Sequence, residues 1–196
     1  MATRAPHRPD EAPSQRRLER RWLPALAVVG VIVFVTGGAQ AVGDALAGPP
    51  GPPVDVGGAV RVQPEPGWEL EGQDADAALL VRGTARLFIQ ARTGTTITAV
   101  DLARSYVEDD ATGLRARFSQ LTVEDPPEEV VAANGLPGLR FGYVGETKDG
   151  ASIEGVVTVV VSSSGSAVIF DGFATMGDLA WAVGDLRTMV DGAVVA

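Results

Sequence analysis

Few residues of this chain have side chains that could act in catalysis. The sequence of 196 residues has no cysteine, and its single histidine, His7, lies near the N-terminus. A nucleophile activated by histidine, or a thiolate metal site, is therefore not expected in the rest of the chain. The one lysine, Lys148, lies in the turn sequence "TKDG", and its expected exposure there argues against a Ser–Lys dyad.

Carboxylates are the remaining candidates for acid–base chemistry. Glu124, Asp125, Glu128 and Glu129 gather in "EDPPEE", and a pair of such acids could support glycoside hydrolysis. The two prolines between them indicate a solvated loop rather than a closed active site. A small carboxylate-dependent hydrolase is therefore the third of three hypotheses.

Metal and nucleotide motifs are incomplete. Asp74 and Asp76 in "GQDADAA" resemble the start of a calcium-binding loop, but the later glycine and distal glutamate of that loop do not follow. No glycine-rich nucleotide fingerprint occurs. We predict no catalytic residue, no cofactor and no metal site, and weak calcium binding stays an open alternative.

The net charge of −9 is distributed unevenly. Residues 1–21 contain six arginines against three acidic residues, whereas residues 22–196 contain 10 basic and 22 acidic residues. Such an acidic body repels phosphate backbones, so we expect no nucleic-acid partner.

An apolar segment follows the basic tail. Residues 22–43, "WLPALAVVGVIVFVTGGAQAVG", carry no formal charge. As a helix they would extend roughly 33 Å, about the thickness of a bilayer core. Four arginines in residues 16–21 precede the segment, and this asymmetry predicts a disordered cytoplasmic tail (1–21), a single transmembrane helix (22–43) and an extracytoplasmic C-terminal body in the cell membrane.

A cleaved signal peptide is the alternative for the same segment. The sequences "AQA" (39–41) and "ALA" (45–47) are small-x-small patterns of the kind that signal peptidase recognises. The long tail and the length of the apolar segment favour a retained anchor. Cleavage would instead release the body as a secreted protein.

The rest of the chain divides into a spacer and a domain. The sequence "GPPGPPVDVGG" places a Gly/Pro-rich, semi-rigid stalk at residues 44–58. Residues 59–196 are enough for one independent domain. Alternating, β-branched or aromatic segments predict strands, in chain order "AVRVQP", "GWELEG", "ALLVRG", "ARLFIQAR", two around the prolines of residues 118–135, "LRFGYVGE", "SIEGVVTVVVSS" and "SAVIFDGFA".

Two helices are predicted among these strands. In "TAVDLARSYVEDDATG", Thr98 and Asp101 have capping spacing, and Val100, Ala103 and Val107 form the expected core face. In the C-terminal helix, Thr175 and Asp178 repeat the capping spacing. Its expected core stripe is Leu179, Val183, Leu186 and Val190, and Trp181, off this stripe, either packs at the rim of the sheet or is exposed for a partner, with rim packing favoured. The fold class is therefore α+β, an antiparallel sheet with helices packed on it, and these two helices are expected to cover one face.

The sequence "NGLPGLRFGYVGETKDG" (134–150) contains a G-x-x-G of the type that clamps nucleic acid in one family of RNA-binding domains. That use requires basic flanks and bracketing helices. Here the pattern lies between predicted strands of an acidic body. We interpret Asn134-Gly135 and Lys148-Asp149-Gly150 as two turns on either side of one strand.

The order of these elements resembles the Mog1/PsbP-like α/β/α sandwich, and more narrowly the LpqN-type envelope proteins of actinobacteria. The resemblance covers roughly residues 59–194 and rests on Pro66-Gly67-Trp68, on the Asn134–Gly138 segment and on Gly172 before the last helix. It implies a non-enzymatic binding or assembly module. The chain departs from the lipoprotein branch because it has no lipid-accepting cysteine.

These observations lead to an expected function. The first hypothesis is a single-pass, membrane-anchored, extracytoplasmic accessory module that binds a protein of the cell envelope or of a secretion apparatus. The second is a secreted carrier of a lipid or small apolar ligand, with a pocket between sheet and helix. The sequence does not indicate which residues bind the partner.

Overall fold

The computed structural model describes residues 49–109 and 113–196. The predicted tail (1–21), the predicted membrane segment (22–43) and the first residues of the predicted stalk lie outside these ranges, as does His7. Within the described ranges, no helix is both long and apolar enough to cross a membrane. The described residues belong to one compact unit, Gly48–Ala196.

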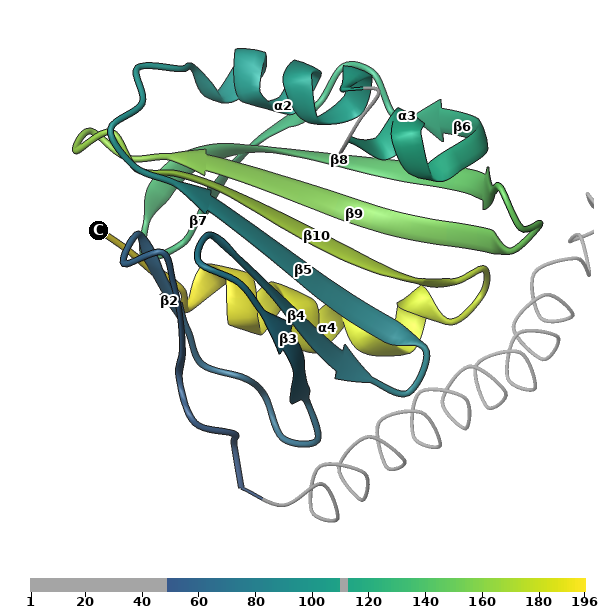
Figure 1. The fold of residues 1–196 in the computed structure, drawn as a ribbon, viewed down its shortest axis with the longest axis horizontal. Coiled ribbons are helices and arrows are strands. Elements are labelled where there is room, and N and C mark those ends of the chain that lie inside the picture. The colour runs from purple at the N-terminus through teal and green to yellow at the C-terminus, as the bar shows by residue number, and fades with distance from the viewer. Residues whose placement is uncertain (1–48, 110–112) are drawn as a thin grey trace, which may run out of the picture. The chain divides into compact units, whose positions relative to one another are not determined.

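An antiparallel sheet of eight strands forms the centre of this unit (Figure 1). Its order is β3-β4-β5-β10-β9-β8-β6, and β7 also pairs with β8. The strands are β3 (Glu69–Gln73), β4 (Ala77–Arg82), β5 (Ala85–Arg92), β6 (Phe118–Val123), β7 (Glu128–Ala132), β8 (Leu136–Thr147), β9 (Ser152–Val161) and β10 (Ala167–Thr175). The predicted antiparallel meander is confirmed as β8-β9-β10.

A small second sheet joins the two ends of the domain. It has the order β1-β2-β11, with β1 at Val54–Val56, β2 at Val60–Val62 and β11 at Val194–Val195. Val54 and Val56 are only 5% and 0% exposed. Residues 54–58, predicted to lie in the stalk, therefore belong to the folded domain, because the alternating valines of β1 enter the core.

Helices cover both faces of the large sheet (Figure 1). α2 (Ala99–Glu108) and α3 (Leu114–Arg117) lie on one face, and α4 (Leu179–Asp191) lies on the other. Each face has its own cluster of buried apolar side chains. The predicted α+β class, an antiparallel sheet with packed helices, is confirmed, but the expectation that the helices cover one face is wrong, because each face carries apolar side chains that require a cover.

α2 begins where the sequence predicts, but it buries a different face. Thr98 Oγ1 accepts a hydrogen bond from the backbone amide of Asp101 at 3.1 Å, which caps the helix. Val100, predicted to face the core, is 52% exposed. The buried side chains of α2 are Leu102, Ala103 and Tyr106. The predicted stripe is therefore wrong at Val100, because the helix turns the adjacent face, with Tyr106, toward the sheet.

The N-terminus of α4 is capped by a neighbouring strand. Thr175 still belongs to β10, and Asp178 makes no side-chain capping bond, so the predicted Thr175–Asp178 cap is wrong. Instead, Glu154 Oε1 on β9 accepts hydrogen bonds from the backbone amides of Gly177 and Leu179, each at 2.9 Å. A carboxylate at this end of a helix also compensates the helix dipole.

The buried stripe of α4 agrees with the predicted one at Leu186 and Val190, whereas Leu179 is only partly buried. Val183 is 46% exposed, and the side chains that enter the core are Ala182, Leu186, Met189 and Val190. Gly172 on β10 admits the Leu186 side chain, since a Cβ on this glycine would lie 2.9 Å from Leu186 Cδ1. Trp181 lies against Arg82 at the rim of the sheet, 5.6 Å from ring centroid to guanidinium carbon, and stays 39% exposed.

The G-x-x-G segment is confirmed as part of a turn and a strand. Ala133, Asn134 and Gly135 have φ of 43°, 60° and 88°, and they connect β7 to β8. The backbone amides of Ala133 and Asn134 donate to the carbonyl oxygens of Val190 and Asp191 at 3.1 and 3.0 Å. This turn therefore caps the C-terminus of α4, where carbonyl groups lack partners within the helix.

Candidate functional site

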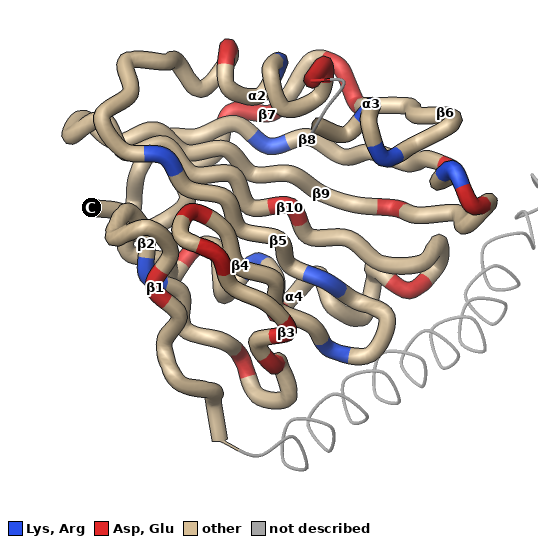
Figure 2. Tube along the Cα trace, viewed as in Figure 1, with Lys and Arg blue, Asp and Glu red and all other residues tan. Residues whose placement is uncertain are grey.

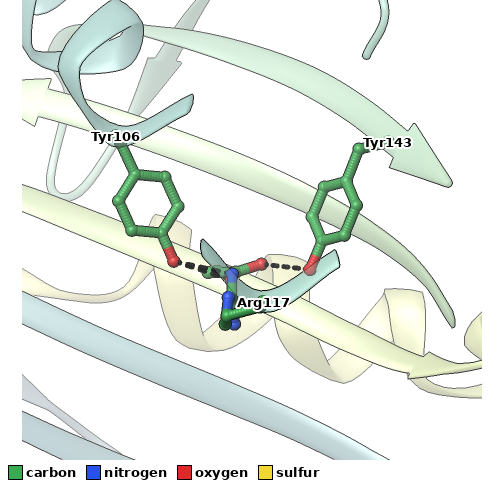
Figure 3. Close-up of polar contacts among 4 residues, drawn as sticks. Tyr106, Arg117 and Tyr143 are labelled. Carbon is green, nitrogen blue, oxygen red and sulfur yellow. Dashed lines mark hydrogen bonds and ion pairs between the residues drawn. The ribbon is translucent and has the colours of Figure 1, made fainter. Parts of the chain in front are cut away.

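A buried polar cluster connects α2 and α3 to the sheet (Figure 3). At its centre is Asp171 on β10, whose exposed fraction is 0%. Tyr106 of α2 donates its hydroxyl to Asp171 Oδ2 at 2.7 Å, and Tyr143 of β8 donates to Oδ1 at 2.9 Å. Arg117 of α3 donates to Oδ2 at 2.5 Å. One carboxylate thus receives hydrogen bonds from three different elements.

Aromatic rings surround the guanidinium of Arg117. Its central carbon lies 5.9 Å from the ring centroid of Tyr106, 5.8 Å from Phe118 and 5.5 Å from Phe173. These distances are within the range of cation–π attraction. Arg117 Nε is buried without a hydrogen-bond partner in the described part of the chain. The charge of Arg117 is nevertheless compensated, because Asp171 lies in direct contact with it.

The cluster holds both tyrosines in the protonated form. Burial, followed by the negative charge of Asp171, raises the pKa of Tyr106 and of Tyr143 well above the ordinary value. Burial alone would lower the pKa of Arg117, but the charge of Asp171, the two neighbouring tyrosines and the hydrogen bond to Asp171 together outweigh this effect, and the net change is upward. The tyrosines therefore serve as hydrogen-bond donors rather than as proton acceptors, and the cluster acts as an internal tie between helices and sheet.

We expect alkaline unfolding to coincide with tyrosine ionisation. The sequence contains two tyrosines, both in this cluster. Their pKa is higher in the folded than in the unfolded state, so their contribution is complete below about pH 10 and is lost as pH rises further, by about 1.4 kcal/mol per pH unit for each tyrosine. Near-ultraviolet tyrosinate absorbance and circular dichroism should change together. Tyrosinate absorbance in a protein that is still folded would contradict the arrangement.

Gly155 on β9 makes room for the ring of Tyr143. A Cβ at this position would lie 2.6 Å from Tyr143 Oη, and the glycine is buried. We therefore expect Gly155→Ala to lower the free energy of unfolding by about 1–3 kcal/mol, since a buried, tied ring cannot move away. Denaturant unfolding measures this cost. Gly184→Ala, on the open side of α4 with nothing within 4 Å, is the matched control and should not destabilise the protein.

The position of α2 leaves a groove on the same face of the sheet. α2 lies over β8 and β9, and the edge strands β6 and β7 lie beyond it. Three adjoining hollows of about 420, 540 and 600 Å³ share residues and follow α2 on this side. We call them together the α2 groove. Its apolar lining includes Val100, Ala103, Val107, Leu121, Val123, Val131, Leu139 and Phe141.

Two valines of the α2 groove are unusually open to solvent. Val100 on α2 is 52% exposed and Val131 on β7 is 72% exposed. They line the same hollow from opposite sides, above a floor that includes Leu139 of β8. Exposed apolar side chains that gather in a depression mark interaction sites more often than isolated ones do.

The acids of "EDPPEE" lie around this groove. Glu124 and Asp125 line its central hollow, and Glu129 lines the hollow next to Val131. Glu124 Oε2 also accepts a hydrogen bond from the backbone amide of Gly142 at 3.0 Å. Glu128 is an exposed residue at the start of β7. The structure thus places Glu124, Asp125 and Glu129 on the open rim of the groove, and it places Glu128 and Glu129 in a strand rather than in the predicted loop.

The other residues considered from the sequence lie elsewhere. Lys148 is exposed in the turn between β8 and β9, and Asp74 and Asp76 are exposed in the turn between β3 and β4. In the ranges 49–109 and 113–196, no group of three or more acidic, histidine or cysteine residues is arranged to hold a metal ion. These residues are not brought together with the α2 groove or the buried cluster.

Sequence reasoning missed the buried cluster. The available signal was a charged residue, Asp171, within the apolar strand sequence "AVIFDGFA". A buried carboxylate requires partners, and the two tyrosines of the chain were candidates. The distances along the chain, from position 106 to 171, are too great for spacing alone to indicate the contact.

A second cavity lies beneath α4. It has a volume of about 140 Å³ between this helix and the sheet, and Arg140 and Arg187 lie at its lining. The volume is below the range of about 300–1,000 Å³ that is usual for small-molecule sites. Close by, Asp185 accepts hydrogen bonds from Trp68 Nε1 at 2.9 Å and from Arg82. This second polar contact fixes α4 to the sheet.

Comparison with known proteins reveals similar folds. No family model matches the chain, and no curated protein matches it. LpqN, a Mycobacterium tuberculosis protein involved in cell envelope biogenesis, is similar in structure with a TM-score of 0.50, 16% identity and coverage of 76% of this chain and 87% of LpqN. PsbP of Synechocystis sp. PCC 6803 has a TM-score of 0.49 and 12% identity, covering 70% of this chain and 87% of PsbP.

A third similar structure is a protein of Bacteroides thetaiotaomicron, with a TM-score of 0.49, 10% identity and coverage of 74% of this chain. The present chain spans about half of that protein, 48% of its length. The similarity to LpqN confirms the fold expected from the resemblance to Mog1/PsbP-like and LpqN-type domains.

Proposed function

We propose that this protein is a non-catalytic binding module that holds another protein in the α2 groove. The observation that carries the proposal is the pair of exposed valines, Val100 and Val131, which face a shared apolar hollow. A partner side chain docked in this hollow would cover both valines. Burying a fully exposed valine side chain is worth about 1.5 kcal/mol.

The buried cluster supports a binding role rather than a catalytic one. The Asp171 carboxylate accepts hydrogen bonds from three side chains, and the pKa values of Tyr106 and Tyr143 are raised. A general base needs a pKa near the working pH and access to its substrate. These groups instead hold α2 in place, and a rigid helix gives the groove a fixed wall.

We further propose that the module is anchored in the cell membrane and faces the outside. The apolar segment 22–43 and the arginines that precede it support a single pass with the N-terminus in the cytoplasm. The structural similarity to LpqN, a protein involved in cell envelope biogenesis, is consistent with an accessory role in an actinobacterial envelope or secretion apparatus.

Carriage of a lipid or small apolar ligand is the less favoured alternative. The pocket between α4 and the sheet, of about 140 Å³, is small for such a ligand, and the larger hollows of the α2 groove are bordered by acidic side chains that disfavour an apolar or anionic ligand. The anchored and released forms differ at the N-terminus. Mass spectrometry of the mature protein should find an intact N-terminus, whereas a mature end near Val42 or Gly48 would favour release and carriage.

Site-specific photocrosslinking tests the binding role. A photoreactive phenylalanine analogue is introduced in place of Val100 or Val131 in the full-length protein, which is expressed in its native cells. In the control proteins the analogue replaces Leu70 or Val194. All four residues are exposed, at 52%, 72%, 45% and 53%. We expect a discrete adduct from the two groove positions only. No adduct, or the same adducts from all four positions, would contradict the proposal.

A further inference from the structure

We propose that the occupant of the α2 groove is a segment of another protein with apolar side chains flanked by lysine or arginine. This inference rests on the proposed function and specifies its partner. The groove supplies two independent features, an apolar floor with open valines and an acidic rim. A partner segment that matches both features has apolar side chains where it contacts the floor of the groove and basic side chains where it contacts the acidic rim.

The rim charges are mostly negative. Glu108 at the end of α2 and Glu124 and Asp125 beyond β6 border the central hollow, and Glu129 on β7 borders the hollow of Val131. Figure 2 shows the corresponding acidic segments at the end of α2 and along β7. These side chains come from both walls of the groove, so a bound segment passes between acidic groups on either side.

The basic residues of the groove offset this potential only in part. Arg104 lies on the central hollow but forms an ion pair with Asp101, at 3.6 Å. Arg115 lines the hollow at the opposite end, next to β6. The acidic side chains therefore lie on the central hollow and on the hollow of Val100 and Val131, and not on the hollow next to β6. Complementary charge accelerates encounter and selects among partners, even where it adds little affinity.

The length of the groove fits a short segment. α2 has 10 residues, which corresponds to about 15 Å of helix axis. A wall of this length accommodates roughly three turns of helix or about five extended residues. An anionic lipid surface or a nucleic acid would be repelled by the same rim.

Peptide selection tests the partner's chemistry directly. A random dodecapeptide display library is selected on the immobilised full-length protein, with counter-selection on a Val100→Ser/Val131→Ser variant. We expect the enriched peptides to combine apolar residues with an excess of lysine and arginine. Individual enriched peptides are then synthesised, and their affinities are measured at low and high salt, where the affinity should fall as salt rises.

Charge reversal provides the matched control. The Glu108→Lys/Glu129→Lys variant should weaken peptide binding at least tenfold. The Glu69→Lys/Asp74→Lys variant makes the same change in net charge on the β3 side of the sheet and should leave the peptide affinity unchanged. Groove-dependent peptides without a basic excess would overturn this inference and leave the binding function standing. A library with no groove-dependent peptides would overturn both. Sedimentation measures whether the protein is a dimer. If it is, and if the Glu108→Lys/Glu129→Lys variant is a monomer, the occupant of the groove is a second copy of this chain, and the inference is overturned.

Discussion

An Asp171→Asn variant is expected to be about 3 kcal/mol less stable than the unmodified protein. The substitution keeps the shape of the side chain but removes the negative charge that compensates Arg117. Removing one partner of a buried ion pair costs about 3–5 kcal/mol, and we expect the lower value because the Arg117 side chain is 32% exposed. The free energy of unfolding in urea measures the loss.

Two controls separate the ion pair from a general effect of the substitution. Asp74→Asn changes an exposed aspartate in the β3–β4 turn and should alter stability by less than about 0.5 kcal/mol. Combining Asp171→Asn with Arg117→Met should cost less than the sum of the two single changes, since the charges act on one another. A loss below about 1 kcal/mol for Asp171→Asn alone would show that the cluster does not hold the helices.

The Val100→Ser/Val131→Ser variant is expected to bind the partner captured by crosslinking about 20-fold more weakly. Burying a fully exposed valine is worth about 1.5 kcal/mol, and because Val100 and Val131 are 52% and 72% exposed, covering both is worth about 1.9 kcal/mol, or roughly a 20-fold change in dissociation constant. Isothermal titration calorimetry with the identified partner measures the change.

The same variant should keep its thermal stability. Val100 and Val131 are 52% and 72% exposed in the unbound domain, so the folded state loses little when they become polar. Leu70→Ser/Val194→Ser, at comparably exposed positions away from α2, should bind the partner normally. Equal weakening by both double variants would assign the binding surface to another part of the domain.

The strands of this domain could be predicted because alternation directly encodes a half-buried strand. The segment "ARLFIQAR" is observed as β5, Ala85–Arg92, in which buried side chains alternate with partly buried ones and, at Arg92, an exposed one. The prolines of residues 126 and 127 separate β6 from β7 as expected. The β1 and β11 strands are three and two residues long, and so short a strand leaves no periodic signal.

The faces of the helices could not be predicted with the same certainty. α2 offers two adjacent apolar faces, one with Val100 and Val107 and one with Leu102 and Tyr106, and Ala103 belongs to both. Periodicity alone does not choose between them. The choice follows from Asp171, a residue 65 positions away from Tyr106, whose carboxylate requires donors. The valines that the sequence assigns to the core are thereby left to line the α2 groove.

Amide hydrogen exchange of the full-length protein, with and without the crosslinked partner, tests the central claim most directly. We predict that the partner slows exchange in α2, in β6 and β7 and in the segment 124–127 between them, and leaves β3, β4 and α4 unchanged. Protection confined to α4 or to β3 and β4 would contradict the account, because the partner would then bind a surface other than the α2 groove.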